Sequence, residues 1–361
     1  MGSPCRIVVN DAISRRGISG SARATAQLTS ALRQIAGVSV ESVTPSWSGR
    51  SANPVKNAVR DAWWDLRGAA KAADRPDLLV SPCNIGAGPG ARRHLLVVYD
   101  VMVFENPEYF DSKFSRYFRT LVPPSVRRAD RVLTLSHHAR QHLLELAPKA
   151  DIRVLTLPGR TEDLAPARWS VRRSVLMVGG TEPHKNHVAG IKAVAALRER
   201  SGLDLALRII GPVGRAEVDV QAQVAHHDPF RTWVSRESGL TDSELDDAYG
   251  SAWLLLQPSI NEGYGLPLVE AAQRGLPVVH SGAGAMSEVI ASGNAEGADP
   301  NHLAVAMEPL IDDLEWQRQS ARLLREAQRF SWDLFPQHVA GLVDGLLPTP
   351  SIIQREDHLG C

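Results

Sequence analysis

Short runs of consecutive apolar residues recur along the chain, and each is followed by a polar turn. These runs are 6–9 (RIVV), 95–100 (LLVVYD), 131–136 (RVLTLS), 174–180 (SVLMVGG), 205–211 (LALRIIG), 252–259 (AWLLLQPS) and 276–281 (LPVVHS). Continuous rather than alternating apolar runs are typical of strands buried on both faces of a parallel sheet. Stretches such as 187–200 have the periodicity of a helix instead. Alternating strands and helices predict an α/β fold of doubly wound sheets.

This alternation pauses at 157–173, which is rich in Pro, Arg and polar residues, before a new strand begins at Ser174. We interpret the pause as a linker between two doubly wound domains. The predicted divisions are an N-terminal domain at 1–165, a C-terminal domain at 166–335, and a C-terminal segment at 336–361. That segment is a candidate to pack back on the N-terminal domain, and its tail is expected to be loosely ordered. Ligands bind open α/β sheets beyond the carboxyl ends of the strands, so the functional residues should follow strands.

Composition and charge narrow the classes of function. The length of 361 residues suits two domains better than one core. The 40 Lys and Arg residues equal the 40 Asp and Glu residues, which argues against a general nucleic-acid binder. Cys5, Cys83 and Cys361 are far apart, which predicts free thiols in a reducing compartment rather than a disulfide frame or a zinc site. No apolar run reaches the roughly 18 residues of a membrane span, and no signal peptide is recognised. We therefore expect a cytoplasmic protein.

The first candidate site follows the run at 174–180. There a predicted strand ends in Gly179 and Gly180, and Lys185 precedes a predicted helix. Glycines let the backbone approach a ligand closely, a helix N-terminus presents N–H groups, and the lysine adds a positive charge, a combination that suits a phosphate. An ordinary strand–turn–helix with a solvated lysine explains the same residues. On this stretch alone, that simpler interpretation is preferred.

The second candidate site is NEGYGLPLVE, at 261–270. It reads as a loop followed by a helix with Pro267 at its first position, where proline is tolerated. The amides of Gly265 and Leu266 would then point into the cleft as unpaired donors. Glu262 can accept hydrogen bonds from sugar hydroxyls, and Glu270 could hold a ribose diol, because a carboxylate accepts two or more directed bonds. Glu270 could equally be an acid that stabilises a helix N-terminus.

Together, these stretches resemble the glycosyltransferase family 4 enzymes, the retaining group 1 glycosyltransferases of the GT-B fold. EGYGLPLVE (262–270) matches the E-x7-E motif of that family, with Tyr264 where Phe is usual. Stretches 178–186 (VGGTEPHKN), 207–215 (LRIIGPVGR), 330–335 (FSWDLF) and 98–140 of the N-terminal half are similar to other stretches of the family. The resemblance covers roughly 5–345, and the ordered set is far more specific than E-x7-E alone. It implies two Rossmann-like domains facing a central cleft.

The resemblance also implies roles for individual residues. Lys185 would hold the diphosphate of a nucleoside-diphosphate sugar beside Gly180, and Glu262 would contact hydroxyls of the transferred sugar. Glu270 would bind the ribose. The backbone amides that would contact sugar and phosphate are those of Gly263, Tyr264, Gly265 and Leu266. A lysine and a helix N-terminus would stabilise the charge on the leaving diphosphate.

Family members transfer a sugar with retention at the anomeric carbon. We expect a hexose, with a mannose-like sugar as the guess, and a role in polysaccharide biosynthesis. The acceptor would be a glycan, a lipid-linked molecule or a small molecule, bound by the N-terminal domain. No DxD pair is present to hold a divalent metal, since LDDAY (245–249) and IDDLE (311–315) lack the spacing. We therefore predict a metal-independent transferase with no cofactor besides its donor substrate.

Two positions depart from the family. His-Asp often follows a strand of the acceptor-side domain, whereas here Tyr99 precedes Asp100. Both remain candidate catalytic residues; either Asp100 makes more of the polar contact, or the activity is altered or lost. His184 stands where an arginine usually assists the lysine in donor binding. A protonated His184 would make a pH-dependent clamp, or Arg208 or Arg215 would supply the charge, or the charge is lower. The alternative function is a catalytically silent nucleotide-sugar-binding protein.

Two further features give weaker predictions. Gly17 and Gly20 follow the first strand and could form an acceptor or phosphate loop, although a plain turn explains them equally well. The segment 112–131 carries basic and aromatic residues. That composition suits peripheral contact with the inner face of the plasma membrane, whereas members of the family pack helices of this region on the domain core. No nucleic-acid partner is expected.

Overall fold

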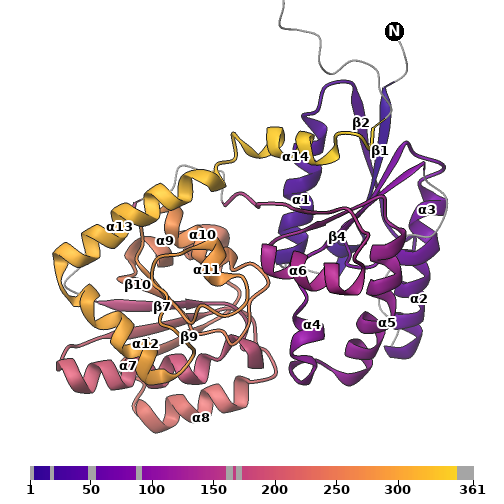
Figure 1. Cartoon of the computed structure of the whole chain (residues 1–361). Coiled ribbons are helices and arrows are strands. Elements are labelled where there is room, and N and C mark those ends of the chain that lie inside the picture. Colours follow the sequence, from indigo (N-terminus) through magenta and orange to yellow (C-terminus); the bar gives the residue numbers. More distant parts are fainter. Residues whose placement is uncertain are drawn as a thin grey trace, which may run out of the picture. The chain divides into compact units, whose positions relative to one another are not determined.

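A computed structural model of the chain describes residues 4–16, 20–47, 54–86, 92–159, 166–167 and 173–347. The chain divides into two compact units (Figure 1). The first unit contains Met1–Phe104, Ser112–Leu157 and Asp333–Cys361, and the second contains Glu105–Asp111 and Pro158–Trp332. The division at Leu157 falls at the start of the stretch that the sequence marks as a linker, eight residues before the predicted boundary at 165.

The first unit is built on a six-stranded sheet in the order β2-β1-β3-β4-β5-β6, in which every neighbouring pair is parallel. Its strands are β1 (Cys5–Asn10), β2 (Val38–Val43), β3 (Leu78–Ser81), β4 (Arg93–Val98), β5 (Arg131–Thr134) and β6 (Ile152–Val154). Its helices are η1 (Ala12–Arg16), α1 (Gly20–Arg33), α2 (Pro54–Trp63), the π-helix η2 (Trp64–Gly68), α3 (Ala69–Ala72), α4 (Met102–Glu105, whose last residue falls in the second unit), α5 (Ser112–Arg128), α6 (His137–Leu146) and α14 (Phe335–Val343).

The second unit is built on a five-stranded sheet in the order β11-β10-β7-β8-β9, again with every neighbouring pair parallel. Its strands are β7 (Ser174–Val178), β8 (Ala206–Ile210), β9 (Val234–Glu237), β10 (Leu254–Gln257) and β11 (Val278–His280). Its helices are η3 (Pro107–Tyr109), η4 (Pro183–Lys185), α7 (His187–Ser201), α8 (Glu217–His227), α9 (Asp242–Ser251), α10 (Leu266–Gln273), α11 (Met286–Val289), α12 (Pro300–Met307), η5 (Glu308–Ile311), α13 (Asp313–Ala327) and η6 (Gln328–Phe330).

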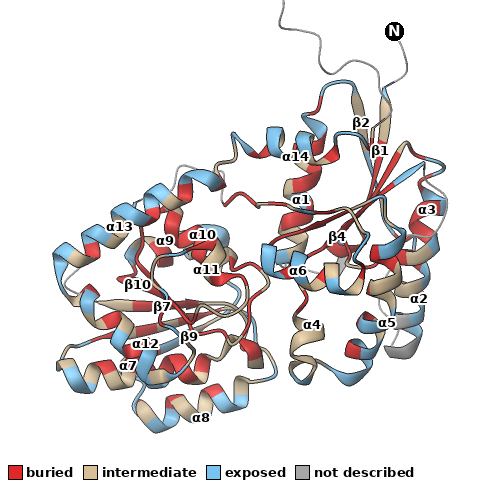
Figure 2. Cartoon of the chain, in the orientation of Figure 1, coloured by how far each residue is buried: buried red, intermediate tan, exposed pale blue. Residues whose placement is uncertain are grey.

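Burial explains why these apolar runs become strands. Strands β3, β4, β7, β8 and β10 are buried along most or all of their length, as continuous apolar runs predict. Figure 2 shows the buried positions along both sheets and on parts of the helices. The prediction of α/β architecture with two doubly wound parallel sheets is therefore confirmed.

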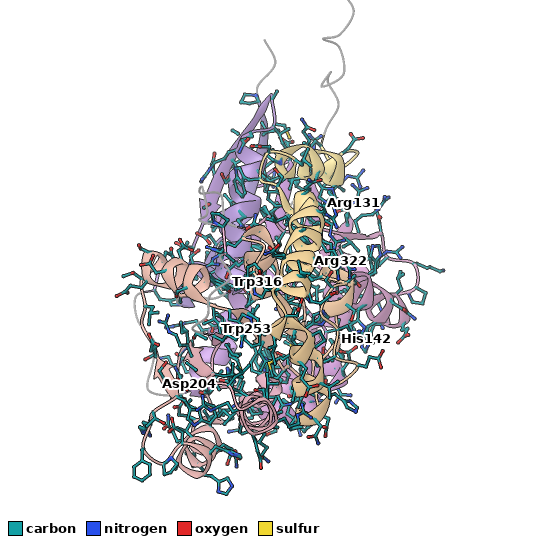
Figure 3. All side chains as sticks on the ribbon, turned by 90° about the vertical axis from the view of Figure 1, so that its left-hand side faces the viewer. Arg131, His142, Asp204, Trp253, Trp316 and Arg322 are labelled. Carbon is teal, nitrogen blue, oxygen red and sulfur yellow. The ribbon has the colours of Figure 1, made fainter. Side chains whose placement is uncertain are left out.

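The final helix belongs to the first unit, although it follows the last helices of the second unit in sequence. Helix α14 contacts α1. Arg131, labelled in Figure 3, donates to the main-chain oxygens of Leu342 at 2.7 Å and Asp344 at 2.8 Å. Within the second unit, the indole nitrogen of Trp316 on α13 donates to the main-chain oxygen of Trp253 at 2.7 Å. These hydrogen bonds hold α14 and α13 against residues that are far away in sequence.

Helix α5 carries the basic and aromatic segment that the sequence singles out. Phe118 is buried and packs against the ring of Phe104, with 5.6 Å between the ring centroids. Phe114, by contrast, is 45% exposed. Lys113 and Arg116 are exposed and line a largely apolar cavity of about 650 Å³ between α5 and the helices α2 and η2. Helix α5 thus buries one aromatic side against its own unit. Among the described residues, no helix is long and apolar enough to cross a bilayer, and contact with a membrane surface stays a prediction.

Candidate functional site

A buried ion pair lies at the carboxyl ends of two neighbouring strands of the second unit. Lys185, in η4 after β7, donates from Nζ to Oε1 of Glu262 at 2.9 Å and to Oε2 at 2.7 Å. Glu262 lies in the loop between β10 and α10. The side chains of Lys185 and Glu262 are only 17% and 11% exposed. The structure thus brings together the two charged residues that the sequence assigns to diphosphate and sugar.

Two neutral side chains complete the surroundings of the Glu262 carboxylate. Gln257 donates to Oε2 at 3.0 Å, and the Ser259 hydroxyl donates to the same oxygen at 3.1 Å. Burial by itself would raise the pKa of Glu262. The charge of Lys185, its hydrogen bond and the hydrogen bond from Ser259 outweigh that effect and hold the pKa below its ordinary value. Glu262 is therefore ionised at neutral pH despite its burial.

The backbone after Glu262 turns sharply before helix α10 begins at Leu266. Gly265 precedes the helix with φ of 94°, a left-handed conformation that favours glycine. The carbonyl of Glu262 accepts a hydrogen bond from the amide of Ala285 at 2.9 Å. Tyr264 is 6% exposed, and Gly263 and Leu266 are half-buried. The loop thereby places the helix N-terminus directly after the carboxylate, where N–H groups without intrahelical partners can meet an anion.

Glu270 lies on α10, beyond its first turn, and is 3% exposed. Its Oε2 accepts a hydrogen bond from the hydroxyl of Tyr249 on α9 at 2.8 Å. Arg274 lies over the ring of Tyr249, with 4.8 Å between its guanidinium carbon and the ring centroid, and pairs with Asp246. Glu270 is thus a buried acid in a hydrogen-bonded network. No acid lies in the first turn of α10, so the position of Glu270 does not favour the alternative that it stabilises the helix N-terminus.

His184 and the glycines lie around Lys185. The ring of His184 is buried and stacked on Phe110, with 6.1 Å between ring centroids. Burial, followed by the charge of Lys185, lowers the pKa of His184, so the imidazole is neutral at neutral pH. This lowering argues against a clamp that is protonated near neutrality. Gly179 is packed against the Lys185 side chain, and Gly180 against Pro212 in the next loop.

Arg208 and Arg215 could each supply the positive charge that His184 does not, and they lie in different places. Arg215 pairs with Glu182 at 3.1 Å and donates to the main-chain oxygen of Tyr109. Its charge is close enough to contribute to the lowered pKa of His184. Arg208 instead binds both carboxylate oxygens of Glu237 at 3.0 Å. Of the two, Arg215 is the one beside the Lys185 loop.

Two buried polar atoms near the ion pair have no hydrogen-bond partner among the residues that the structure describes. They are Nδ1 of His184 and Oδ1 of Asn261. The amide nitrogen of Asn261 donates to side-chain oxygens of Glu105 and Asn106, each at 2.7 Å. Buried polar groups almost always find a partner. Orphaned atoms next to Lys185 and Glu262 are therefore consistent with a site that a polar ligand completes.

Tyr99 and Asp100 follow β4 in the first unit. The Tyr99 hydroxyl is hydrogen-bonded to the hydroxyl of Thr25 on α1 at 2.6 Å, and the residue is 4% exposed. Burial raises the pKa of Tyr99 far above its ordinary value, so its phenol is neutral. Asp100 is half-buried and accepts from the amide of Met102 at 3.2 Å. Gly20 begins helix α1, whereas Gly17 lies outside the described residues.

Sequence reasoning missed three residues that hold the two acids in place. Gln257 and Ser259 contact Glu262, and Tyr249 contacts Glu270. One signal was available: Gln257 and Ser259 are polar residues at the end of an apolar run, the place where ligands meet open sheets. Tyr249 gave no such signal, because its contact crosses from one helix to another.

Two family models together match most of the chain. "Glycosyltransferase Family 4" matches residues 18–157, and "Glycosyl transferases group 1" matches residues 166–329. Among curated proteins, the chain is similar to O-antigen chain mannosyltransferase B of Escherichia coli, with 27% identity over 75% of this chain and 73% of that protein.

Two solved structures show the same fold. Sucrose-phosphate synthase from Thermosynechococcus elongatus has a TM-score of 0.72 and 16% identity over 93% of this chain and 98% of that chain. HepE of Anabaena, in complex with UDP and glucose, has a TM-score of 0.69 and 14% identity over 95% and 100%.

Proposed function

We propose that this chain, which belongs to glycosyltransferase family 4, the group 1 glycosyltransferases of the GT-B fold, transfers a hexose from a nucleoside-diphosphate sugar to a glycan. That the chain is a glycosyltransferase follows from its family. The donor, the sugar, the acceptor, the stereochemistry and the independence from metal are the proposed part. The observation that carries the proposal is the buried ion pair of Lys185 and Glu262, next to the N-terminus of α10.

The chemistry of transfer matches the charges at this pair. Cleavage of the bond between sugar and phosphate leaves negative charge on the diphosphate and positive charge on the sugar ring. Lys185 and the amides of Gly265 and Leu266, which precede Pro267 at the start of α10, stabilise the departing diphosphate. The carboxylate of Glu262 accepts hydrogen bonds from sugar hydroxyls and stabilises the developing positive charge. Groups already fixed in a buried site supply such stabilisation without reorganisation during the reaction.

Glu270 is proposed to bind the ribose, with Tyr249 holding its carboxylate in place. Arg215 is proposed to supply the second positive charge at the diphosphate, because it lies beside the Lys185 loop and His184 is neutral. In the first unit, Asp100 is proposed to make the polar contact expected from the family's His-Asp pair, since the Tyr99 hydroxyl is hydrogen-bonded to Thr25.

Three finer points rest on likeness and chemistry. The name of the Escherichia coli relative supports a mannose-like sugar. The structure of HepE with UDP and glucose supports a nucleotide-sugar donor. Retention is expected from the family. Because the sequence has no DxD pair and positive side chains are available for the diphosphate, we propose that transfer needs no divalent metal.

A donor panel tests the proposal. Melting temperature is measured with UDP-, GDP-, ADP- and dTDP-sugars, since a ligand that binds only the folded state stabilises it by about 2.7 kcal/mol at 100 times its Kd. The stabilising donor is then offered with glycan acceptors, with and without EDTA, and the anomeric configuration of the product is read by NMR. The proposal expects transfer with retention that EDTA leaves unchanged. Binding without transfer or donor hydrolysis for every acceptor would instead favour a silent sugar-nucleotide-binding protein.

A further inference from the structure

The two oxygens of the Glu262 carboxylate have different surroundings. Oε2 accepts three hydrogen bonds, from Lys185 at 2.7 Å, Gln257 at 3.0 Å and Ser259 at 3.1 Å. Oε1 accepts one, from Lys185 at 2.9 Å, within the part of the chain that the structure describes. Gln257 and Ser259 therefore hold the carboxylate through Oε2. Among the described residues, Oε1 accepts a hydrogen bond from Lys185 alone.

Strand β10 and the loop that follows it fix the two neutral donors. Gln257 is the last residue of β10, Ser259 follows two positions later, and they are 2% and 0% exposed. Gln257 also donates to the Ser259 hydroxyl at 3.0 Å, and the carbonyl of Ser259 accepts from the hydroxyl of Ser281 at 2.5 Å. Burying an amide and a hydroxyl is unfavourable unless their hydrogen bonds are made. Here those bonds converge on a single carboxylate oxygen.

We infer that Gln257 and Ser259 are positioning residues that hold Oε2 of Glu262 and reserve Oε1 for a hydroxyl of the transferred sugar. When a donor binds, its diphosphate draws Lys185 away from the carboxylate, and the sugar hydroxyl takes the place of the ammonium group on Oε1. The two neutral donors keep the carboxylate in the same orientation during this exchange. The inference rests on the proposed function and deepens it by assigning residues to the sugar subsite.

The chemistry gives these residues a role beyond packing. Once Lys185 moves to the diphosphate, Glu262 loses its nearest positive charge in a buried site. Hydrogen bonds to the charged form of a carboxylate favour that form. Gln257 and Ser259 therefore keep Glu262 ionised at the moment when the sugar ring gains positive charge. Without them, the carboxylate would rotate or take up a proton.

Three variants test this role. Gln257→Met keeps the side-chain length and removes the donor, and Ser259→Ala removes the hydroxyl. Gln257→Glu places a second carboxyl beside Glu262. The matched control is Gln319→Met, because Gln319 lies on α13 and its amide nitrogen donates to the main-chain oxygen of Val278 at 3.1 Å, away from Glu262. Steady-state rates are measured against pH with the sugar nucleotide that the wild-type chain uses, and affinity is measured for the matching nucleoside diphosphate.

We expect Gln257→Met and Ser259→Ala to lower kcat about tenfold, because each removes one hydrogen bond to a charged group. Affinity for the nucleoside diphosphate stays within about twofold, since that ligand lacks the transferred sugar. The acid limb of the kcat/KM profile moves to higher pH in both variants, and furthest in Gln257→Glu, because removing a donor or adding a negative charge raises the pKa of Glu262. A merely structural role would not move that limb.

Wild-type kcat and an unmoved acid limb in all three variants would overturn the inference while the proposed function stands. A fall in nucleoside-diphosphate affinity as large as the fall in kcat would also overturn it, because the residues would then serve the whole site. If the wild-type chain transfers no sugar from any donor, the proposed function fails first and the inference fails with it. Gln319→Met is expected to behave as wild type throughout.

Discussion

After strand β4 of the first unit, the buried hydroxyls of Tyr99 and Thr25 hydrogen-bond to each other at 2.6 Å. After strands β7 and β10 of the second unit, a lysine and a glutamate with side chains that are 17% and 11% exposed form an ion pair at 2.7 Å. Tyr99, Lys185 and Glu262 each follow an interior strand of a parallel sheet, and Thr25 lies on α1. The first pair is neutral and satisfied within the fold. The second carries two charges, each of which can make stronger bonds with a ligand.

We propose that the first pair stabilises the fold, whereas the second serves chemistry. A buried ion pair contributes little net stability, because the cost of desolvating two charges offsets most of their attraction. A fold that needed only stability would do as well with two apolar side chains at Lys185 and Glu262. Charges kept in such a place are therefore candidates for function. The pair of Tyr99 and Thr25 carries no such cost.

Neutralising the ion pair should have the largest effect. Lys185→Met or Glu262→Gln should lower the transfer rate by about 10²–10³-fold, the usual loss when one electrostatic group at a reacting centre is removed. Each should also lower the free energy of unfolding by about 3–5 kcal/mol, because the remaining charge is buried without its partner. Transfer rates measure the first effect, and the midpoints of urea unfolding measure the second.

The double variant Lys185→Met/Glu262→Gln separates these effects. It buries no charge, so most of the lost stability should return, whereas transfer should stay abolished. A double variant that regained transfer together with stability would show that the pair is structural. In that case the contrast with Tyr99 and Thr25 would disappear.

A smaller effect is expected at the second positive charge. Arg215→Ala should weaken nucleoside-diphosphate binding about tenfold, because hydrogen bonds to charged groups contribute about 1.5 kcal/mol or more. Arg208→Ala should change that affinity less than twofold, since Arg208 is held by Glu237. Calorimetric titration measures both affinities. A larger loss in Arg208→Ala would reverse the assignment.

A matched pair of tyrosine variants compares the two units directly. Tyr249→Phe removes the hydrogen bond from the Tyr249 hydroxyl to the carboxylate of Glu270 and should weaken donor binding about fivefold, the equivalent of about 1 kcal/mol. Tyr99→Phe should lower the free energy of unfolding by about 1 kcal/mol and leave nucleoside-diphosphate affinity unchanged. Calorimetry and urea unfolding report these changes. A hundredfold loss of kcat in Tyr99→Phe would return Tyr99 to the catalytic role that the sequence predicts.

Stability against pH should depend on a buried histidine in each of the two units. Burial lowers the pKa of His94 in the first unit and of His187 in the second to about 4, from an ordinary 6.5. Below pH 6.5 the unfolded chain takes up a proton that the folded chain does not. Stability therefore falls as pH drops from about 6.5 to 4, by at most about 3 kcal/mol for each histidine.

Urea unfolding at pH 7 and pH 5 measures this loss, and the variants His94→Gln and His187→Gln should each make it smaller. Glu262 adds to the loss at lower pH. Its pKa is depressed in the folded state, so its stabilising contribution is present above about 4.5 and disappears as pH falls through the folded pKa. An acid loss that is unchanged in both histidine variants would contradict the burial argument.

Much of the fold could be predicted because buried parallel strands leave continuous apolar runs. Every strand named from its run is present, from β1 to β11. The overlooked edge strands β2, β6 and β9 are three to six residues long and partly exposed, so their sequences mix polar with apolar positions. Strand β3 is buried throughout but only four residues long, and such a run does not stand out from loop sequence.

The candidate site could be predicted in part. Lys185 and Glu262 both follow strands, and the stretches around them resemble motifs of the family. That resemblance made them recognisable. Their direct pairing could not be predicted, because the two residues are far apart in sequence and meet only through the adjacency of β7 and β10. The hydrogen bond between Tyr249 and Glu270 could not be predicted either, because it depends on how α9 packs against α10. Long-range contacts of this kind leave no local pattern.

Differential binding to the ion-pair variants is the decisive measurement. Affinity for a nucleoside diphosphate and for its sugar nucleotide is measured by calorimetry on the wild-type chain, Lys185→Met and Glu262→Gln. Lys185→Met should lose affinity for both ligands. Glu262→Gln should keep its affinity for the nucleoside diphosphate but lose the extra affinity that the transferred sugar provides. Equal affinities for both ligands in all three proteins would contradict the claim that this pair divides the donor between its two charges.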